Sequence, residues 1–108
     1  MVQNSLELAE QKILERIYFV RGEKVMLDRD LAQLYGMETR ALKQAVKRNI
    51  HRFPDDFMFE MTREEFKTWR DQTILEHHDR IGLRHPPFCF TEQGVTMLSC
   101  VLTSKIAI

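Results

Sequence analysis

Seven side chains suited to nucleic-acid recognition lie between residues 39 and 52, in a stretch that contains no Asp or Glu. They are Arg40, Lys43, Gln44, Lys47, Arg48, His51 and Arg52. At about 100° per residue on a helical wheel, one line on the side opposite Val46 contains Arg40, Gln44, Lys47 and His51. A solvent-exposed helix face usually mixes both signs of charge, because opposite charges stabilise it in pairs. A face with one sign therefore indicates a negatively charged partner.

Double-stranded DNA is the partner that these residue types fit best. Arg pairs with guanine and Gln with adenine, each through two hydrogen bonds in the major groove. The residues predicted to reach base edges are Arg40, Lys43 and Gln44. Phosphate contacts fix the register without reading the sequence, and the residues predicted to make them are Lys47, Arg48 and Arg52. His51 is a further contact residue without an assigned role, and Asn49 is predicted to tie the helix to its own backbone.

A pair of helices is predicted to position these residues. Asp28 is expected to cap the first helix, Gly36 to end it in the left-handed conformation, and Thr39 to cap the second. The second helix, residues 39–52, is expected to lie in the major groove, as in a helix-turn-helix. The predicted inward-facing residues are Leu31, Leu34 and Tyr35 in the first helix and Leu42, Val46, Ile50 and Phe53 in the second. A basic face that is merely solvated is the alternative interpretation.

The rest of the chain predicts an α+β fold: an N-terminal β-hairpin, the helix pair, then short strands and helices forming a small sheet packed on helices. The hairpin is expected at residues 17–20 and 24–27, and a strand at 57–61 with Phe57, Phe59 and Met61 on one side. Thr62 and Glu65 form a capping box for a helix to about residue 72, with Phe66 and Trp69 facing inward. A loop follows at 73–87, then a strand at 88–90 and a helix that Thr91 caps.

Two further basic groups are secondary candidates for contact with DNA. Arg21 and Lys24 lie at the tip of the hairpin, which either enters a groove or only supports the helix pair. Arg80 and Arg84 lie in the loop, which either touches the DNA backbone or is a surface loop.

The last helix, residues 91–108, has an apolar stripe of Val95, Leu98, Val101 and Leu102. This stripe either forms a homodimer surface or packs into its own domain, and both interpretations stay open at this point. Its apolar end suggests a fragment of a longer chain or a helix that packs on a partner. Residues 1–16 are expected to form a leader or a short helix.

Composition bounds the function. The chain has 108 residues and no net charge, so the basic stretch is a local feature of one domain, with acidic residues concentrated elsewhere. No apolar run approaches the roughly 20 residues of a membrane span, and the polar N-terminus does not resemble a signal peptide. Cys89 and Cys100 lack metal-ligand spacing and are expected to be reduced, buried thiols in a cytoplasmic protein.

Two other functions are alternatives to DNA binding. Neighbouring histidines His77 and His78, with Asp79, suggest a metal-dependent nuclease, but adjacent residues do not share a face in a helix or a strand. No glycine-rich phosphate loop or nucleophile elbow is present, so we expect no enzyme, metal or cofactor. A protein-interaction module that uses the same basic helix against an acidic partner remains the alternative function.

Several blocks of sequence, in order, resemble a known family. The first block contains Ile17-Tyr18, Arg21-Gly22, Lys24 to Ala32 and Leu34-Tyr35-Gly36; the second, Val46 to Asn49, Arg52-Phe53-Pro54 and Asp56 to Phe59; the third, Phe90 to Val95 and Met97-Leu98. Together they resemble the phage open-reading-frame-six N-terminal domain, related to the KilA-N and Bro-N DNA-binding domains. The resemblance implies that residues 17–108 form one KilA-N-like DNA-binding domain. It implies a phage or prophage transcription-regulating protein, antirepressor-like, acting in the cytoplasm of the bacterial host.

Overall fold

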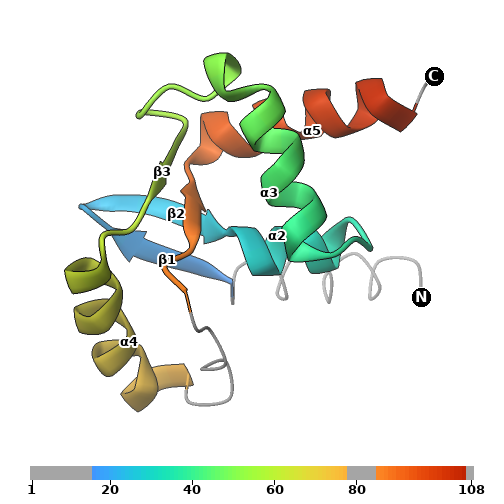
Figure 1. The fold of residues 1–108 in the computed structure, drawn as a ribbon. Coiled ribbons are helices and arrows are strands. Elements are labelled where there is room, and N and C mark those ends of the chain that lie inside the picture. Colours follow the sequence, from blue (N-terminus) through green and yellow to red (C-terminus); the bar gives the residue numbers. More distant parts are fainter. Residues whose placement is uncertain (1–15, 78–84, 107–108) are drawn as a thin grey trace, which may run out of the picture.

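A four-stranded antiparallel sheet organises the chain in the computed structural model, which describes residues 16–77 and 85–106 (Figure 1). Its strands are β1 (Ile17–Val20), β2 (Glu23–Leu27), β3 (Met58–Glu60) and β4 (Phe88–Phe90), in the order β1-β2-β4-β3. Helices pack on both faces, so the predicted α+β class is confirmed. The leader or short helix expected at residues 1–16 lies outside the described residues, apart from Arg16.

The N-terminal hairpin forms where the sequence predicts it. Val20 pairs with Glu23, so Arg21 and Gly22 alone make the turn. Both have positive φ, 55° and 75°, the conformation that matches a two-residue turn to the twist of its strands. The hairpin feeds directly into the first helix of the pair.

The helix pair consists of α2 (Asp28–Leu34) and α3 (Thr39–Arg48). Gly36, at φ 65°, ends α2 as predicted. Its N–H donates to the Gln33 carbonyl at 3.2 Å and that of Met37 to the Ala32 carbonyl at 2.9 Å, the pattern of a Schellman motif. The two predicted N-caps are wrong. Asp28 and Thr39 are the first residues inside their helices, and neither helix has a side-chain cap.

The second helix is shorter than predicted. It stops at Arg48, and a separate 3₁₀ turn, η1 (Ile50–Arg52), follows it. The backbone leaves helical geometry at Asn49 (φ −122°, ψ 31°), which rotates Ile50 away from the inward stripe. Ile50 is 54% exposed, whereas Leu42, Val46 and Phe53 are buried as predicted. In the first helix Leu31 is buried, but Leu34 and Tyr35 are exposed, contrary to expectation.

The sheet separates two apolar layers. Side chains alternate between the two faces of a strand. One face packs on α2, α3 and α5 (Glu92–Ile106) and carries Met26, Met58 and Phe90. The other packs on α4 (Arg63–His77) and carries Val25, Leu27, Phe59 and Cys89, with Met61 just beyond β3. Phe66 is buried in the second layer and Trp69 packs against it, as predicted. Figure 1 shows α4 on the opposite side of the sheet from α3. The expectation of one inward side for strand 57–61 is thus incomplete, because β3 is covered on both faces.

The capping box at the start of α4 is confirmed. Glu65 N–H donates to Thr62 Oγ1 at 3.0 Å, and Thr62 N–H donates to Glu65 Oε1 at 2.9 Å. The helix runs to His77, so the loop predicted from residue 73 begins too early. Arg80 and Arg84 lie outside the described residues.

Thr91 caps α5, as predicted. Its Oγ1 accepts a hydrogen bond from the Gly94 N–H at 3.3 Å and donates to the Asp56 carbonyl at 2.7 Å. The stripe residues Leu98, Val101 and Leu102 are buried among the side chains of their own domain. That burial favours the alternative in which the stripe packs into its own domain and leaves a homodimer surface on helix 91–108 without support. No helix in the described ranges has the length and apolar character needed to cross a membrane.

Candidate nucleic-acid interface

The outward side of α3 and η1 carries six polar side chains, which we call the basic ridge. It consists of Arg40, Gln44, Lys47, Arg48, His51 and Arg52, all of them exposed. The opposite side of α3 contributes Leu42, Ala45 and Val46 to the core, each at most 3% exposed. The core contacts fix the rotation of the helix about its own axis. They therefore hold the ridge toward solvent.

The charges of the basic ridge are not neutralised within the described part of the chain. No carboxylate there forms an ion pair with Arg40, Lys47, Arg48 or Arg52. Lys47 and Arg48 lie in the last turn of α3, where positive charge also interacts favourably with the helix dipole. The ridge thus presents uncompensated positive charge to a partner.

Lys43 differs from the other predicted contact residues because it points inward. Its Nζ lies 3.4 Å from Asp28 Oδ2 and 5.0 Å from the centre of the Phe88 ring. Asp28 is 1% exposed. Its carboxylate also accepts hydrogen bonds from the N–H groups of Arg29 at 2.7 Å and Phe88 at 3.0 Å.

The Asp28 carboxylate thus connects α2, α3 and β4. Sequence reasoning assigned Asp28 to a helix cap and Lys43 to the DNA surface, and so missed this junction. Only the mutual placement of three elements brings the two side chains together. The one local signal was an Asp at the junction of a strand and a helix.

Asn49 makes the backbone tie that the sequence predicts. Its Nδ2 donates to the Ala45 carbonyl at 2.9 Å, and its backbone N–H donates to the Val46 carbonyl at 3.0 Å. These bonds satisfy carbonyls at the end of α3 that would otherwise lack partners. They fix the step from α3 into η1, which sets where His51 and Arg52 lie.

Arg21, a predicted secondary contact, is held by the protein itself. Its guanidinium donates two hydrogen bonds of 2.7 Å to the Glu65 carboxylate and lies 4.1 Å from the centre of the Phe59 ring. These hydrogen bonds, with one from the Thr62 N–H, lower the pKa of Glu65 to about 2, and the pKa of Arg21 is raised. The arrangement fastens the hairpin to α4. Lys24, the other residue of this group, is exposed.

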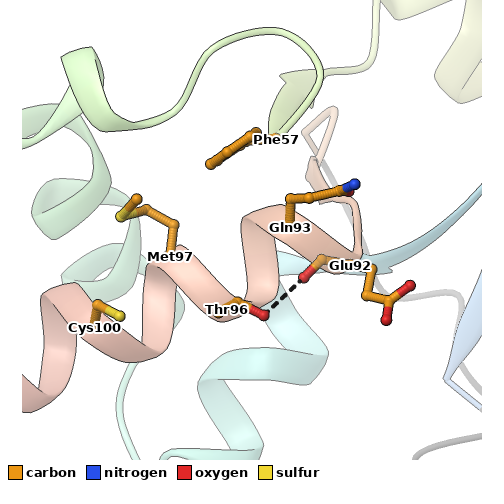
Figure 2. A pocket seen from close by; sticks show the side chains of 6 residues that line it. All are labelled: Phe57, Glu92, Gln93, Thr96, Met97 and Cys100. Atoms are coloured by element: carbon orange, nitrogen blue, oxygen red, sulfur yellow. Dashed lines mark hydrogen bonds between the residues drawn. The ribbon is translucent and has the colours of Figure 1, made fainter.

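A groove lies elsewhere, between α5 and the segment that leads into β3 (Figure 2). Its lining residues are Phe57, Glu92, Gln93, Thr96, Met97 and Cys100. Figure 2 shows the Thr96 hydroxyl turned back to the Glu92 carbonyl, to which it donates at 3.2 Å. Residues 16–77 and 85–106 contain no group of three or more potential metal ligands.

The two thiols differ from each other, contrary to the expectation that both are buried. Cys89 is buried in β4, and desolvation raises the pKa of its thiol to about 12. Cys100 is exposed on α5. Because its pKa is so high, the Cys89 thiol stays protonated at neutral pH and is a poor nucleophile or metal ligand.

These features define a small α+β domain that presents a positively charged helix and its 3₁₀ extension to solvent. The protein-family model of the ORF6N domain matches residues 15–101. The chain belongs to the ORF6N domain family, as its resemblance to the phage open-reading-frame-six N-terminal domain predicts. Membership points to a phage-type DNA-binding regulatory domain. A search of curated proteins and a search of solved structures each gave no match.

Proposed function

We propose that this protein binds double-stranded DNA with α3 in the major groove, and that residues 17–108 form the DNA-binding unit. The observation that carries the proposal is the basic ridge, which is exposed and has no ion-pair partner in the described ranges. The phosphate backbone is the partner that such a one-signed surface fits. Family membership supports the same partner.

Within the ridge, Arg40 and Gln44 are the base-reading residues in this proposal. Both are exposed in the N-terminal half of α3, and Ala41 beside them is exposed and small enough to permit close approach. Lys47, Arg48 and Arg52 contact phosphates, with His51 beside them. Lys43 has a different role from the one the sequence suggested: paired with Asp28, it orients α3 and leaves base contact to its neighbours.

The regulatory role follows as part of the same proposal. In this proposal the protein is a phage or prophage regulator, antirepressor-like, that acts by occupying a specific DNA site. One α3 helix reads only a few base pairs, since about three or four side chains of a recognition helix reach base edges. Two copies of the protein could read a longer DNA site. The apolar stripe of α5 does not supply their contact in this proposal, because Leu98, Val101 and Leu102 are buried in the domain.

A mobility-shift assay with random duplex DNA at low salt is the direct test. We expect a shifted complex that weakens as salt is added. Gln44→Ala is expected to retain non-specific binding and to relax selection at one base position when a randomised duplex pool is sorted. Lys67→Ala, which removes an exposed charge on α4, is the matched control and is expected to behave as wild type.

The alternative function, recognition of an acidic protein by the same ridge, predicts a different outcome. In that case random duplex DNA gives no shift at low salt, while an acidic polypeptide such as polyglutamate binds and loses binding on Lys47→Ala. A shift with DNA and no competition by polyglutamate at equal charge supports DNA as the partner.

A further inference from the structure

Ile50 is an exposed apolar side chain inside the basic ridge. Among the side chains whose burial the structure describes, the large apolar ones left exposed are Phe19, Leu34, Tyr35 and Ile50. Phe19 lies in the hairpin, and Leu34 and Tyr35 lie at the end of α2. Ile50 alone lies in η1, directly before His51 and Arg52 and three residues after Lys47, and it is 54% exposed.

The outward position of Ile50 is fixed by the backbone on both sides. The Arg52 N–H donates to the Asn49 carbonyl at 2.8 Å, and the Phe53 N–H donates to the Ile50 carbonyl at 3.0 Å. Phe53 is buried and packs edge-on against Phe90, with ring centres 6.0 Å apart. The 3₁₀ turn is therefore anchored to the core at its end, and Ile50 cannot fold inward without breaking these bonds.

A partner that covers Ile50 must also meet the charges beside it. Those charges attract a polyanion, and an isoleucine offers it only van der Waals contact. The apolar group that double-stranded DNA exposes on its base edges in the major groove is the 5-methyl group of thymine. Charge and apolar surface on one rigid turn thus fit a DNA segment that contains thymine.

We propose that Ile50 contacts a thymine methyl group at the edge of the site that α3 reads, an inference that rests on the proposed function. Burying one methyl group against an apolar side chain corresponds to about a fourfold change in affinity. Ile50 has no charge, so its contribution is independent of salt, unlike that of Lys47 or Arg52. Ile50 thereby adds sequence preference at the end of α3 where the charged residues supply none.

The test uses a duplex that the wild-type protein selects from a randomised pool, prepared once with thymine and once with every thymine replaced by deoxyuridine. Uracil lacks only the methyl group, so base pairing and backbone charge are retained. Dissociation constants for both duplexes are measured for wild type, Ile50→Ala and Phe19→Ala. Phe19 is 69% exposed in β1, away from the ridge, and provides the matched apolar control. Circular dichroism and thermal unfolding verify that each variant is folded.

We expect wild type and Phe19→Ala to bind the uracil duplex about fourfold more weakly than the thymine duplex. Ile50→Ala is expected to bind the thymine duplex about fourfold more weakly than wild type. For this variant the ratio of the dissociation constants of the two duplexes is expected to fall toward one, and the salt slope to stay unchanged. If Ile50→Ala retains the wild-type preference for thymine, or wild type shows no preference, the thymine contact is refuted while DNA binding stands. If wild type binds neither duplex, the proposed function itself fails.

Discussion

Replacing Asp28 with Asn tests how α3 is held against the rest of the domain. The buried carboxylate accepts two backbone hydrogen bonds, at 2.7 and 3.0 Å, and lies 3.4 Å from Lys43 Nζ. An amide of the same shape has one acceptor oxygen, and its NH₂ group then faces a donor. One hydrogen bond to a charged group is lost, which costs about 1.5–3 kcal/mol, and the ion pair with Lys43 is lost with it, for up to about 1 kcal/mol more. We expect Asp28→Asn to lower the free energy of unfolding by about 3 kcal/mol.

Urea unfolding followed by circular dichroism measures this loss. A decrease of about 3 kcal/mol corresponds to a melting temperature about 12–24 °C lower for a domain of this size. Asp71→Asn on α4, where the side chain is exposed, is the control and is expected to change stability by less than about 0.5 kcal/mol. Lys43→Met leaves both backbone bonds to Asp28 but removes the countercharge of a buried carboxylate, so it is expected to cost about 3 kcal/mol as well. The reasoning is refuted if either Asp28→Asn or Lys43→Met unfolds like wild type.

Three further predictions concern the sheet and its helices. A Cβ at Gly94 would overlap the carbonyl oxygen just before β3, so Gly94→Ala is expected to lose about 2–3 kcal/mol in urea unfolding; wild-type stability would show that α5 sits farther from that strand. With its pKa lowered to about 2 in the fold, Glu65 stabilises fully above its usual pKa of about 4.5 and loses this effect as pH falls toward 2. Because Glu65 and Arg21 are partly exposed, Glu65→Gln is expected to cost only about 1 kcal/mol at pH 7 and to flatten the acid limb of the stability curve, whereas an unchanged limb contradicts the ion pair. Because Cys100 is exposed and Cys89 is buried, Ellman's reagent is expected to react with Cys100 in the native protein and with Cys89 only after unfolding. Native Cys100→Ser is therefore expected to show no rapidly reacting thiol, and a rapid reaction in that variant would contradict the burial of Cys89.

Local signals in the sequence predicted the local elements well. The hairpin turn, the glycine end of α2, the capping box at Thr62 and the cap at Thr91 each depend on a few neighbouring residues. The rotation of α3 about its axis was also predictable. Leu42 and Val46 are four residues apart and share the buried face of the helix, which leaves Arg40 and Lys47 on the other side. Such features follow from periodicity and turn chemistry, which a single sequence records.

Features that depend on distant residues were not predictable in the same way. Asp28 resembles a helix cap until the Phe88 N–H is placed beside it, 60 residues away in the chain. Arg21 resembles a free hairpin charge until α4 brings Glu65 to it. Ile50 fits the inward stripe on an ideal helix, and only the break at Asn49 turns it outward. Tertiary contacts override the local pattern for Asp28 and Arg21, whereas a local backbone break does so for Ile50.

The salt dependence of DNA binding by wild type and Lys47→Ala tests the central claim most directly. With three phosphate contacts from the ridge, the plot of log affinity against log salt is expected to have a slope of about −3. Lys47→Ala is expected to weaken binding to all duplexes alike and to reduce that slope by about 1, while Lys67→Ala leaves both unchanged. Equal affinity and equal slope for wild type and Lys47→Ala would contradict the assignment of the ridge as the DNA-binding surface.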